Sequence, residues 1–418
     1  MRLLHCLHQY HPAIGGAENL MKDVSERLAA RGHQVTVIAT TALSTENYFL
    51  PGKGKALMAA GEESIGGVRV RRVGFTRRGA RTLTFLRKVA WRIPIPGGDT
   101  WRALSWGPRS REYEAAAAGE DFDVATGCPL PNWHVRYALK AARAKSRPLV
   151  IVPCFHTEDI YSFRNPIFYK WMREADAVVT LTDWEREFLV RTAGLREERV
   201  HTIGVGIEDG EAAAARANGG SAIDIRAKYG IREKEIVLFL GQMGAHKGIL
   251  TLIAAMEDAW DHRPDVALVI AGNPTAHTQD IEERIRELDP KSGRKVYVIK
   301  GFPEEEKRAF FRTADLFAQV SPFESFGIVF LEAWRDGVPV IGCRRGGSSK
   351  LIDEFKDGLL ALDGIPRELA AAIEILLADG AARKKMGEAG RRKVLERYTW
   401  DAVIDRWEGL YRGLVGTG

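Results

Sequence analysis

The chain opens with Leu3-Leu4-His5-Cys6-Leu7, a short apolar run, and continues into a loop that carries Gly15-Gly16. An amphipathic pattern then runs from about Ala17 to Arg31, and a β-branched run follows over Gln34–Thr40. A strand, a helix and a second strand in this order form a βαβ unit, whose two strands must be parallel. The start of the chain therefore predicts an α/β fold built on a parallel sheet.

The same alternation continues and then starts afresh after a polar, Gly/Ala-rich stretch at Glu208–Ala222. In the first half, further strands are expected at residues 68–73, 122–126, 148–153, 177–181 and 200–203. In the second half, strands are expected at 235–240, 266–271, 296–299, 316–320 and 338–342, with helices at 247–260, 278–288 and 304–313. Two α/β sandwiches of similar size predict a cleft at the carboxyl ends of both sets of strands.

Length and composition agree with two domains. The chain has 418 residues, of which 45% are hydrophobic, so it can fill two cores. No apolar run is long enough to span a membrane, and the four cysteines show no CxxC spacing. We therefore expect a cytoplasmic protein with unpaired, buried thiols.

Basic residues concentrate between Ser64 and Gly98, where nine of them occur without an acidic residue. They are Arg69, Arg71, Arg72, Arg77, Arg78, Arg81, Arg87, Lys88 and Arg92, interleaved with apolar side chains that include Phe85 and Trp91. Three interpretations are open: a solvated face, a surface for an anionic membrane or a phosphorylated or lipid-linked acceptor, and a nucleic-acid site. No nucleic-acid module accompanies the charge, so the predicted membrane or acceptor surface comprises Arg77, Arg78, Arg81, Arg87, Lys88, Trp91 and Arg92.

Two carboxylates frame the run Glu324-Ser325-Phe326-Gly327-Ile328-Val329-Phe330-Leu331-Glu332. On one straight helix the two acids would splay apart, since each residue turns the helix by about 100°. If the helix instead starts near Phe326, Glu324 lies on the loop before it and Glu332 two turns inside. Free N–H groups around Gly327 would then face an anion. The alternative is an ordinary amphipathic helix that carries two surface acids.

Two other loops follow first strands in the same way. Gly15-Gly16-Ala17-Glu18 is not the G-x-G-x-x-G dinucleotide fingerprint, and it could be a tight structural turn or a loop that approaches phosphate. In Gly241–Gly248, Lys247 opens an expected helix, where a cation is unfavourable unless an anion binds nearby. A solvated surface lysine is the alternative.

Two further features are ambiguous by themselves. His156 follows an expected strand, Leu149–Phe155, and could be a structural or a functional histidine. Asp121-Phe122-Asp123 has the D-x-D spacing of a metal site, but it precedes a strand and so lies at the edge away from the expected cleft. We interpret it as a polar strand start and expect no metal.

These motifs together resemble the GT4 retaining glycosyltransferases, nucleotide-sugar-dependent enzymes of the GT-B fold. The resemblance rests on Gly15-Gly16-Ala17-Glu18, His156, Thr180-Leu181-Thr182-Asp183 with Trp184-Glu185-Arg186, Gly204-Val205-Gly206-Ile207, Gln242…Lys247-Gly248 and Glu324…Glu332. It implies an N-terminal acceptor domain over residues 1–205 and a nucleotide-sugar domain over 206–395. It also implies that a C-terminal helix, 396–418, crosses back onto the first domain.

The resemblance also assigns roles to individual residues. Glu332 would accept hydrogen bonds from the ribose of a UDP- or GDP-sugar, and Glu324 would contact the donor sugar. Diphosphate would be held by amides near Gly15, Gly16, Phe326, Gly327 and Ile328, together with Gln242 and Lys247. His156 would lie near the transferred sugar as a hydrogen-bonding group, and no metal or other cofactor is expected.

One departure from the family concerns phosphate binding. Gln242 stands where the family usually has arginine, and Arg344 and Arg345 are the candidate replacements. The resemblance implies a retaining, metal-independent transferase that acts on a saccharide or lipid-linked acceptor in cell-envelope or polysaccharide synthesis, with peripheral association at the inner face of the membrane as a further expectation. A GT-B epimerase, a phosphorylase and a catalytically weak regulatory subunit remain alternatives.

Overall fold

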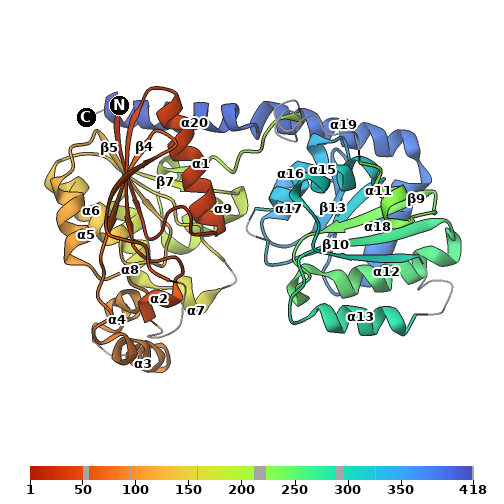
Figure 1. The fold of residues 1–418 in the computed structure, drawn as a ribbon, viewed down its shortest axis with the longest axis horizontal. Coiled ribbons are helices and arrows are strands. Elements are labelled where there is room, and N and C mark those ends of the chain that lie inside the picture. Colours follow the sequence, from red (N-terminus) through yellow and green to blue (C-terminus); the bar gives the residue numbers. More distant parts are fainter. Residues whose placement is uncertain are drawn as a thin grey trace. The chain divides into compact units, whose positions relative to one another are not determined.

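The computed structural model describes residues 1–49, 56–93, 96–157, 159–210, 223–288, 295–324 and 326–416. The chain divides into two compact units, Met1–Ile203 with Ile404–Gly418, and Gly204–Val403 (Figure 1). The second unit extends past the expected limit at 395 and includes the start of the last helix. Most of the expected linker at Glu208–Ala222 lies outside the described residues.

The first unit holds an eight-stranded sheet in its described part, ordered β3-β4-β2-β1-β5-β6-β7-β8. Adjacent strands of this sheet are parallel, except β3 and β4, which form an antiparallel hairpin. The strands are β1 (Arg2–Leu7), β2 (Gln34–Thr40), β3 (Gly61–Ile65), β4 (Val68–Val73), β5 (Val124–Cys128), β6 (Leu149–Ile151), β7 (Ala177–Thr180) and β8 (Val200–Thr202). Because β1 lies inside the sheet, its residues after Arg2 are all buried, which explains its unbroken apolar run.

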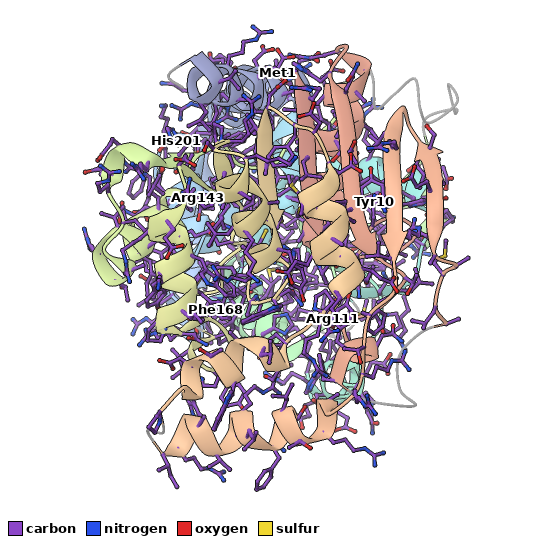
Figure 2. The ribbon with its side chains drawn as sticks, turned by 90° about the vertical axis from the view of Figure 1, so that its left-hand side faces the viewer. Met1, Tyr10, Arg111, Arg143, Phe168 and His201 are labelled. Carbon is purple, nitrogen blue, oxygen red and sulfur yellow. The ribbon has the colours of Figure 1, made fainter. Side chains whose placement is uncertain are left out.

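Helices flank this sheet on both faces (Figure 1). They are α1 (Gly16–Ala30), α2 (Glu46–Phe49), α3 (Ala80–Arg92), α4 (Gly98–Ser105), α5 (Arg111–Gly119), α6 (Val135–Ala144), α7 (Ile160–Phe163), α8 (Pro166–Glu174) and α9 (Asp183–Ala193). Tyr113, Phe168 and Trp171 anchor one core cluster between the helices and the strands. Helices α3 and α4 lie side by side at the bottom of Figure 2, whereas Met1 lies at the top.

The second unit holds a parallel six-stranded sheet within the described ranges, ordered β11-β10-β9-β12-β13-β14. Its strands are β9 (Glu235–Leu240), β10 (Val266–Gly272), β11 (Val296–Lys300), β12 (Leu316–Gln319), β13 (Val340–Cys343) and β14 (Gly358–Ala361). Its helices are α11 (Ile225–Tyr229), α12 (Ile249–His262), α13 (Thr278–Arg286), α15 (Glu304–Thr313), α16 (Ile328–Arg335), α17 (Ser348–Leu351), α18 (Pro366–Ala378) and α19 (Gly380–Arg397). The predicted fold class, two Rossmann-like α/β domains, is confirmed.

The last helix, α20 (Trp400–Gly416), begins in the second unit, and its residues from Ile404 belong to the first. At its start, Gly206 is required because a Cβ there would lie 2.5 Å from the Trp400 ring. Further along, Glu408 lies 2.8 Å from His33 Nε2, and the Tyr411 hydroxyl lies 2.8 Å from Thr126 Oγ1. The predicted return of the C-terminal helix to the first domain is thus present in the structure.

The sequence analysis placed one strand end wrongly and missed one strand. The strand expected to end at Phe155 stops at Ile151, because Pro153 has no N–H for the ladder and Cys154 has a positive φ of 47°. Strand β3 was missed because its residues, Gly-Glu-Glu-Ser-Ile, are mostly polar and exposed at the sheet edge. None of the helices in the described ranges combines the length and apolar character needed to cross a bilayer.

Candidate active site

The first unit presents the glycine turn between β1 and α1. Gly15 has extended backbone with φ −175°, so conformation alone does not require glycine there. A Cβ on Gly15 would lie 2.3 Å from Glu18 Oε2, whereas a Cβ on Gly16 would meet nothing within 4 Å. The predicted phosphate turn therefore has one crowded glycine, packed by Glu18, and one glycine facing open space.

Glu18 pairs with a histidine that the sequence prediction missed. His8, directly after β1, lies with Nε2 3.0 Å from Glu18 Oε1, and both side chains are largely buried. Burial works to raise the pKa of Glu18, but the hydrogen bond and charge of His8 hold that pKa below its ordinary value. The His8 ring also stacks on His134 at 5.7 Å between centroids. An anionic carboxylate and a histidine thus flank the glycine turn. The positions of His8 after β1 and of Glu18 in the first turn of α1 are the sequence signal that could have identified this pair.

His156 lies on the loop after β6 rather than at a strand end. Its side chain is exposed, while Phe155 and Thr157 on either side are buried. The His156 ring lies 5.4 Å from the Phe163 ring, centroid to centroid. The histidine is therefore presented to solvent by a loop whose neighbouring residues are anchored inside the unit.

The second unit presents the start of α16, which begins at Ile328, two residues after the start near Phe326 that the sequence predicts. Gly327 precedes it with φ +88°, a conformation that favours glycine, and a Cβ there would lie 2.5 Å from the Phe330 ring. No side chain of the described residues caps this helix, and within its first turn the Phe330 N–H donates to the Gly327 carbonyl at 2.9 Å. Glu324 lies before the helix and Glu332 inside it, as expected.

Glu324 forms an ion pair with Lys247. Lys247 Nζ lies 2.7 Å from Glu324 Oε2, and Gln319 Nε2 donates to the same oxygen at 2.9 Å. The side chains of Lys247 and Glu324 are 19% and 18% exposed, so a ligand can still reach them. The anion that lies beside Lys247 in this structure is the Glu324 carboxylate, and a bound anion at Lys247 stays a prediction.

The expected position of Lys247 in the first turn of a helix was wrong. Lys247 ends a 3₁₀ turn, Ala245–Lys247, and Gly248 separates it from α12. Gly248 has φ +76°, and a Cβ on it would lie 2.6 Å from the Val320 carbonyl oxygen. This close approach breaks the helical path and turns Lys247 toward the loop after β12.

Glu332 pairs with Lys307 of α15, which the sequence prediction also missed. The Lys307 ammonium lies 2.6 Å from Glu332 Oε1. Burial works to lower the pKa of Lys307, but the Glu332 carboxylate raises it above its ordinary value. Glu332 Oε2 is buried and has no hydrogen-bond partner in the described part of the chain. One carboxylate oxygen is thus fixed by Lys307, whereas the other is buried without a hydrogen-bond partner among the described residues.

The remaining candidates for phosphate binding are Gln242, which is exposed, and Arg344 and Arg345, which pair with carboxylates. Arg344 forms two hydrogen bonds to Glu354, at 2.7 and 2.9 Å, and Arg345 Nε donates to Asp363 at 2.9 Å. The turn after these arginines supports the carboxylate loop, since the Gly347 N–H donates to the Glu324 carbonyl at 2.9 Å. The structure therefore gives the arginine segment a supporting role beside Glu324.

The basic segment Arg69–Arg92 carries less unpaired charge than the sequence suggested. Arg69 and Arg71 pair with Glu62 and Glu120, and Arg72 pairs with Glu63. The charges of these arginines are neutralised in part because β3, which carries Glu62 and Glu63, pairs antiparallel with β4. No local sequence pattern predicts this pairing.

Two members of the predicted surface are also engaged inside the first unit. Arg87 lies 4.3 Å above the Trp106 ring, and Trp91 packs between Tyr161 and the Arg102 guanidinium. Arg77 is half-buried beside Phe75. Arg78, Arg81, Lys88 and Arg92 are exposed.

Asp121 and Asp123 bind an arginine instead of forming an open metal site. The Arg2 side chain contacts both carboxylates, with Nη2 2.7 Å from Asp123 Oδ1. Both acids precede β5, at the sheet edge opposite to His8 and Gly15, as the sequence predicts. All four cysteines are unpaired, and Cys154 is the least buried.

Two family models match the chain. The model "Glycosyltransferase Family 4" matches residues 14–211, and the model "Glycosyl transferases group 1" matches residues 221–393. Alpha-D-kanosaminyltransferase of Streptomyces kanamyceticus is 30% identical over 246 residues, which cover 58% of this chain and 61% of that protein. D-inositol 3-phosphate glycosyltransferase of Corynebacterium glutamicum is 32% identical over 195 residues, 43% of this chain and 44% of that protein. The chain thus spans less than two thirds of the length of these relatives.

The fold has a solved counterpart. The structure of Anabaena HepE in complex with UDP superposes with a TM-score of 0.70 at 18% identity, covering 99% of this chain and all of that one. This likeness shows the GT-B fold. The two family models together account for most of the chain, which therefore belongs to the family 4, group 1 glycosyltransferases.

Proposed function

We propose that the protein transfers a sugar from a nucleoside-diphosphate sugar to a saccharide or lipid-linked acceptor, with retention of configuration and without a metal ion. The arrangement at α16 carries this proposal. An uncapped helix start lies between two carboxylates, each paired with a lysine, and one carboxylate keeps a buried oxygen without a partner. This arrangement offers one group to each part of the donor: N–H groups to the diphosphate, Glu324 to the sugar and Glu332 to the ribose.

Each group has a chemical task in this proposal. The diphosphate leaves with added negative charge, which the amides at Phe326, Gly327 and Ile328 and the Lys247 ammonium would stabilise. Glu332 Oε2 would accept from the ribose, and Glu324 from the donor sugar. The second unit would thus bind the donor, while the first unit binds the acceptor and supplies Gly16 and His156.

A thermal-shift panel of UDP-, GDP- and ADP-sugars tests donor binding. A ligand at 100 times its Kd stabilises the folded state by about 2.7 kcal/mol, so the matching donor should raise Tm by several degrees. UDP-sugars come first, because HepE, which shares the fold, binds UDP. No shift with any donor would defeat the proposal.

Turnover assays with the matching donor separate the alternatives. A transferase needs the acceptor, an epimerase converts the donor without one, and a phosphorylase needs free phosphate. Donor binding without any turnover on saccharide or lipid extracts would indicate a regulatory subunit.

We also propose that the exposed face of α3 contacts an anionic membrane surface. Phe85 and Ile93 are 65% and 57% exposed, and they lie near exposed Arg81, Lys88 and Arg92. Helix α3 fully buries only Ala80, and Leu83, Leu86 and Val89 are half-buried, so Phe85 and Ile93 are the apolar side chains left outside the packed face. Basic and apolar side chains on one short helix suit the headgroup region.

Charge reversal of α3 should abolish recovery with anionic vesicles. Each basic residue near such a surface contributes about 1 kcal/mol, so the triple variant R81E/K88E/R92E should bind at least about a hundredfold more weakly. The matched control R147E/R191E/R196E makes the same charge change at exposed positions elsewhere in the first unit. Co-sedimentation should fall for the first variant only. Equal recovery of the unchanged protein with neutral and anionic vesicles would contradict the proposal.

A further inference from the structure

Helix α9 starts with a capping motif that is used in an unusual way. Thr182 is its N-cap, and Thr182 Oγ1 accepts from the Glu185 N–H at 3.2 Å. In a standard capping box the glutamate returns this bond to the N–H of the cap residue. Here Glu185 Oε2 instead accepts from the Leu181 N–H at 2.8 Å, which leaves Oε1 for another partner.

That partner belongs to the loop that carries His156. The Phe155 N–H donates to Glu185 Oε1 at 2.8 Å. On the other side of the histidine, Trp184 Nε1 donates to Thr157 Oγ1 at 3.0 Å. Consecutive residues of α9 therefore hold the residues before and after His156, while His156 itself is exposed.

Helix capping alone does not explain a glutamate at position 185, because burying its carboxylate costs free energy. Glu185 is 3% exposed, and no Lys, Arg or His of the described ranges forms an ion pair with it. Burial raises the pKa of Glu185 to about 7, although the two backbone N–H groups oppose that rise. Serine, threonine or asparagine caps a helix without this cost, and Thr182 already does so. What the carboxylate adds is a second acceptor oxygen, which joins the loop after β7 to the loop after β6.

We propose that Glu185 and Trp184 are positioning residues for the transfer reaction, because they fix the loop that presents His156. The inference rests on the proposed function, in which His156 hydrogen-bonds the transferred sugar. A rigid loop keeps the imidazole in one orientation before the substrate arrives. Neither Glu185 nor Trp184 contacts the substrate itself.

Substituting E185Q tests the carboxylate with little change of volume. Glutamine has one acceptor oxygen, so it can serve only one of the two N–H groups and places its amide against the other. We expect kcat to fall about tenfold, with donor KM changed less than twofold. In the H156A background, E185Q should cause no further loss, since the two residues act through one group. Independent, multiplicative losses would overturn the inference.

A matched control separates this role from helix stability. T182A removes the cap of the same helix and leaves the Phe155 bond intact, so it should lower Tm but leave kcat unchanged. A kcat loss in T182A as large as that in E185Q would overturn the inference.

Hydrogen exchange gives a readout that does not depend on activity. In E185Q, the amide that loses its acceptor, that of Phe155 or that of Leu181, should exchange at least ten times faster, whereas those of the buried strand β5 should not change. Unchanged exchange at both Phe155 and Leu181 would overturn the inference whether or not transfer is detected. Faster exchange without transfer by the unchanged protein would instead count against the proposed function.

Discussion

Replacing Lys247 with methionine should lower kcat/KM for the nucleotide sugar about a hundred- to a thousandfold while the protein stays folded. Removal of one preorganised group that stabilises developing negative charge typically costs about 10²–10³ in kcat. Lys247 is the cation placed beside Glu324, and Arg344 and Arg345 are already paired with Glu354 and Asp363. The loss should therefore appear in kcat as well as in donor affinity.

The stability effect of this change should be modest. Glu324 keeps its hydrogen bond from Gln319 Nε2 and stays partly exposed after Lys247 is removed. A partly exposed ion pair contributes on the order of 1 kcal/mol, which corresponds to a few degrees of Tm. Steady-state kinetics and a melting curve on the same sample separate the two effects.

A lysine elsewhere in the second unit provides the control. Lys356 is largely exposed and pairs with Asp353 at 3.5 Å, so Lys356→Met removes the same charge without changing the Lys247–Glu324 pair. This control should keep full activity. An active Lys247→Met, within threefold of the unchanged protein, would remove Lys247 from the proposed chemistry.

The sequence predicted those parts of the fold that local patterns encode. Strand β9 was predicted with its observed limits, Glu235–Leu240, because a buried central strand reads as one apolar run. The start of α16 was predicted near Phe326 from the spacing of Glu324 and Glu332, two residues before the observed start at Ile328. The glycine turns after β1 and β9 likewise marked the edges where the candidate residues lie.

The missed features depend on contacts between distant residues. Glu63 neutralises Arg72 only because β3 folds back on β4, and the polar residues of β3 gave no strand signal. Lys307 reaches Glu332 from another helix, and His8 reaches Glu18 across a loop. Such pairs require the topology, so the sequence could name one partner of each pair, Arg72, Glu332 and Glu18, but not the other.

Those pairings change the interpretation of the Glu324–Glu332 motif. Each glutamate already satisfies part of its hydrogen-bonding capacity within the second unit, Glu324 through Lys247 and Glu332 through Lys307. A ligand therefore meets carboxylates whose orientation is set in advance, which reduces the ordering required on binding. It also means that a variant at either position disturbs a lysine, and the choice of substitution must allow for this.

Glutamine is the suitable replacement at both positions, because it can still accept from the neighbouring lysine. Truncation of Glu332 to alanine would leave the half-buried Lys307 ammonium with only the longer contact to Glu304 at 3.6 Å, and the resulting loss of stability would confuse a binding measurement with unfolding. Lys307→Met serves as a control for the ion pair alone. It removes the cation while leaving the buried Glu332 Oε2 available to a hydroxyl.

Glu332→Gln should weaken donor binding by about 10- to 100-fold and change kcat less than threefold, because hydrogen bonds to charged groups contribute about 1.5–3 kcal/mol. Uniform loss of ground-state and transition-state binding appears in KM. Glu324→Gln should instead lower kcat about a hundredfold with a donor Kd within threefold, since Glu324 lies before α16 beside Lys247, where charge develops. Calorimetric titration with the nucleoside diphosphate and kinetics with the full donor measure the two quantities. If Glu324→Gln weakens nucleotide binding and Glu332→Gln slows turnover, the two roles are reversed.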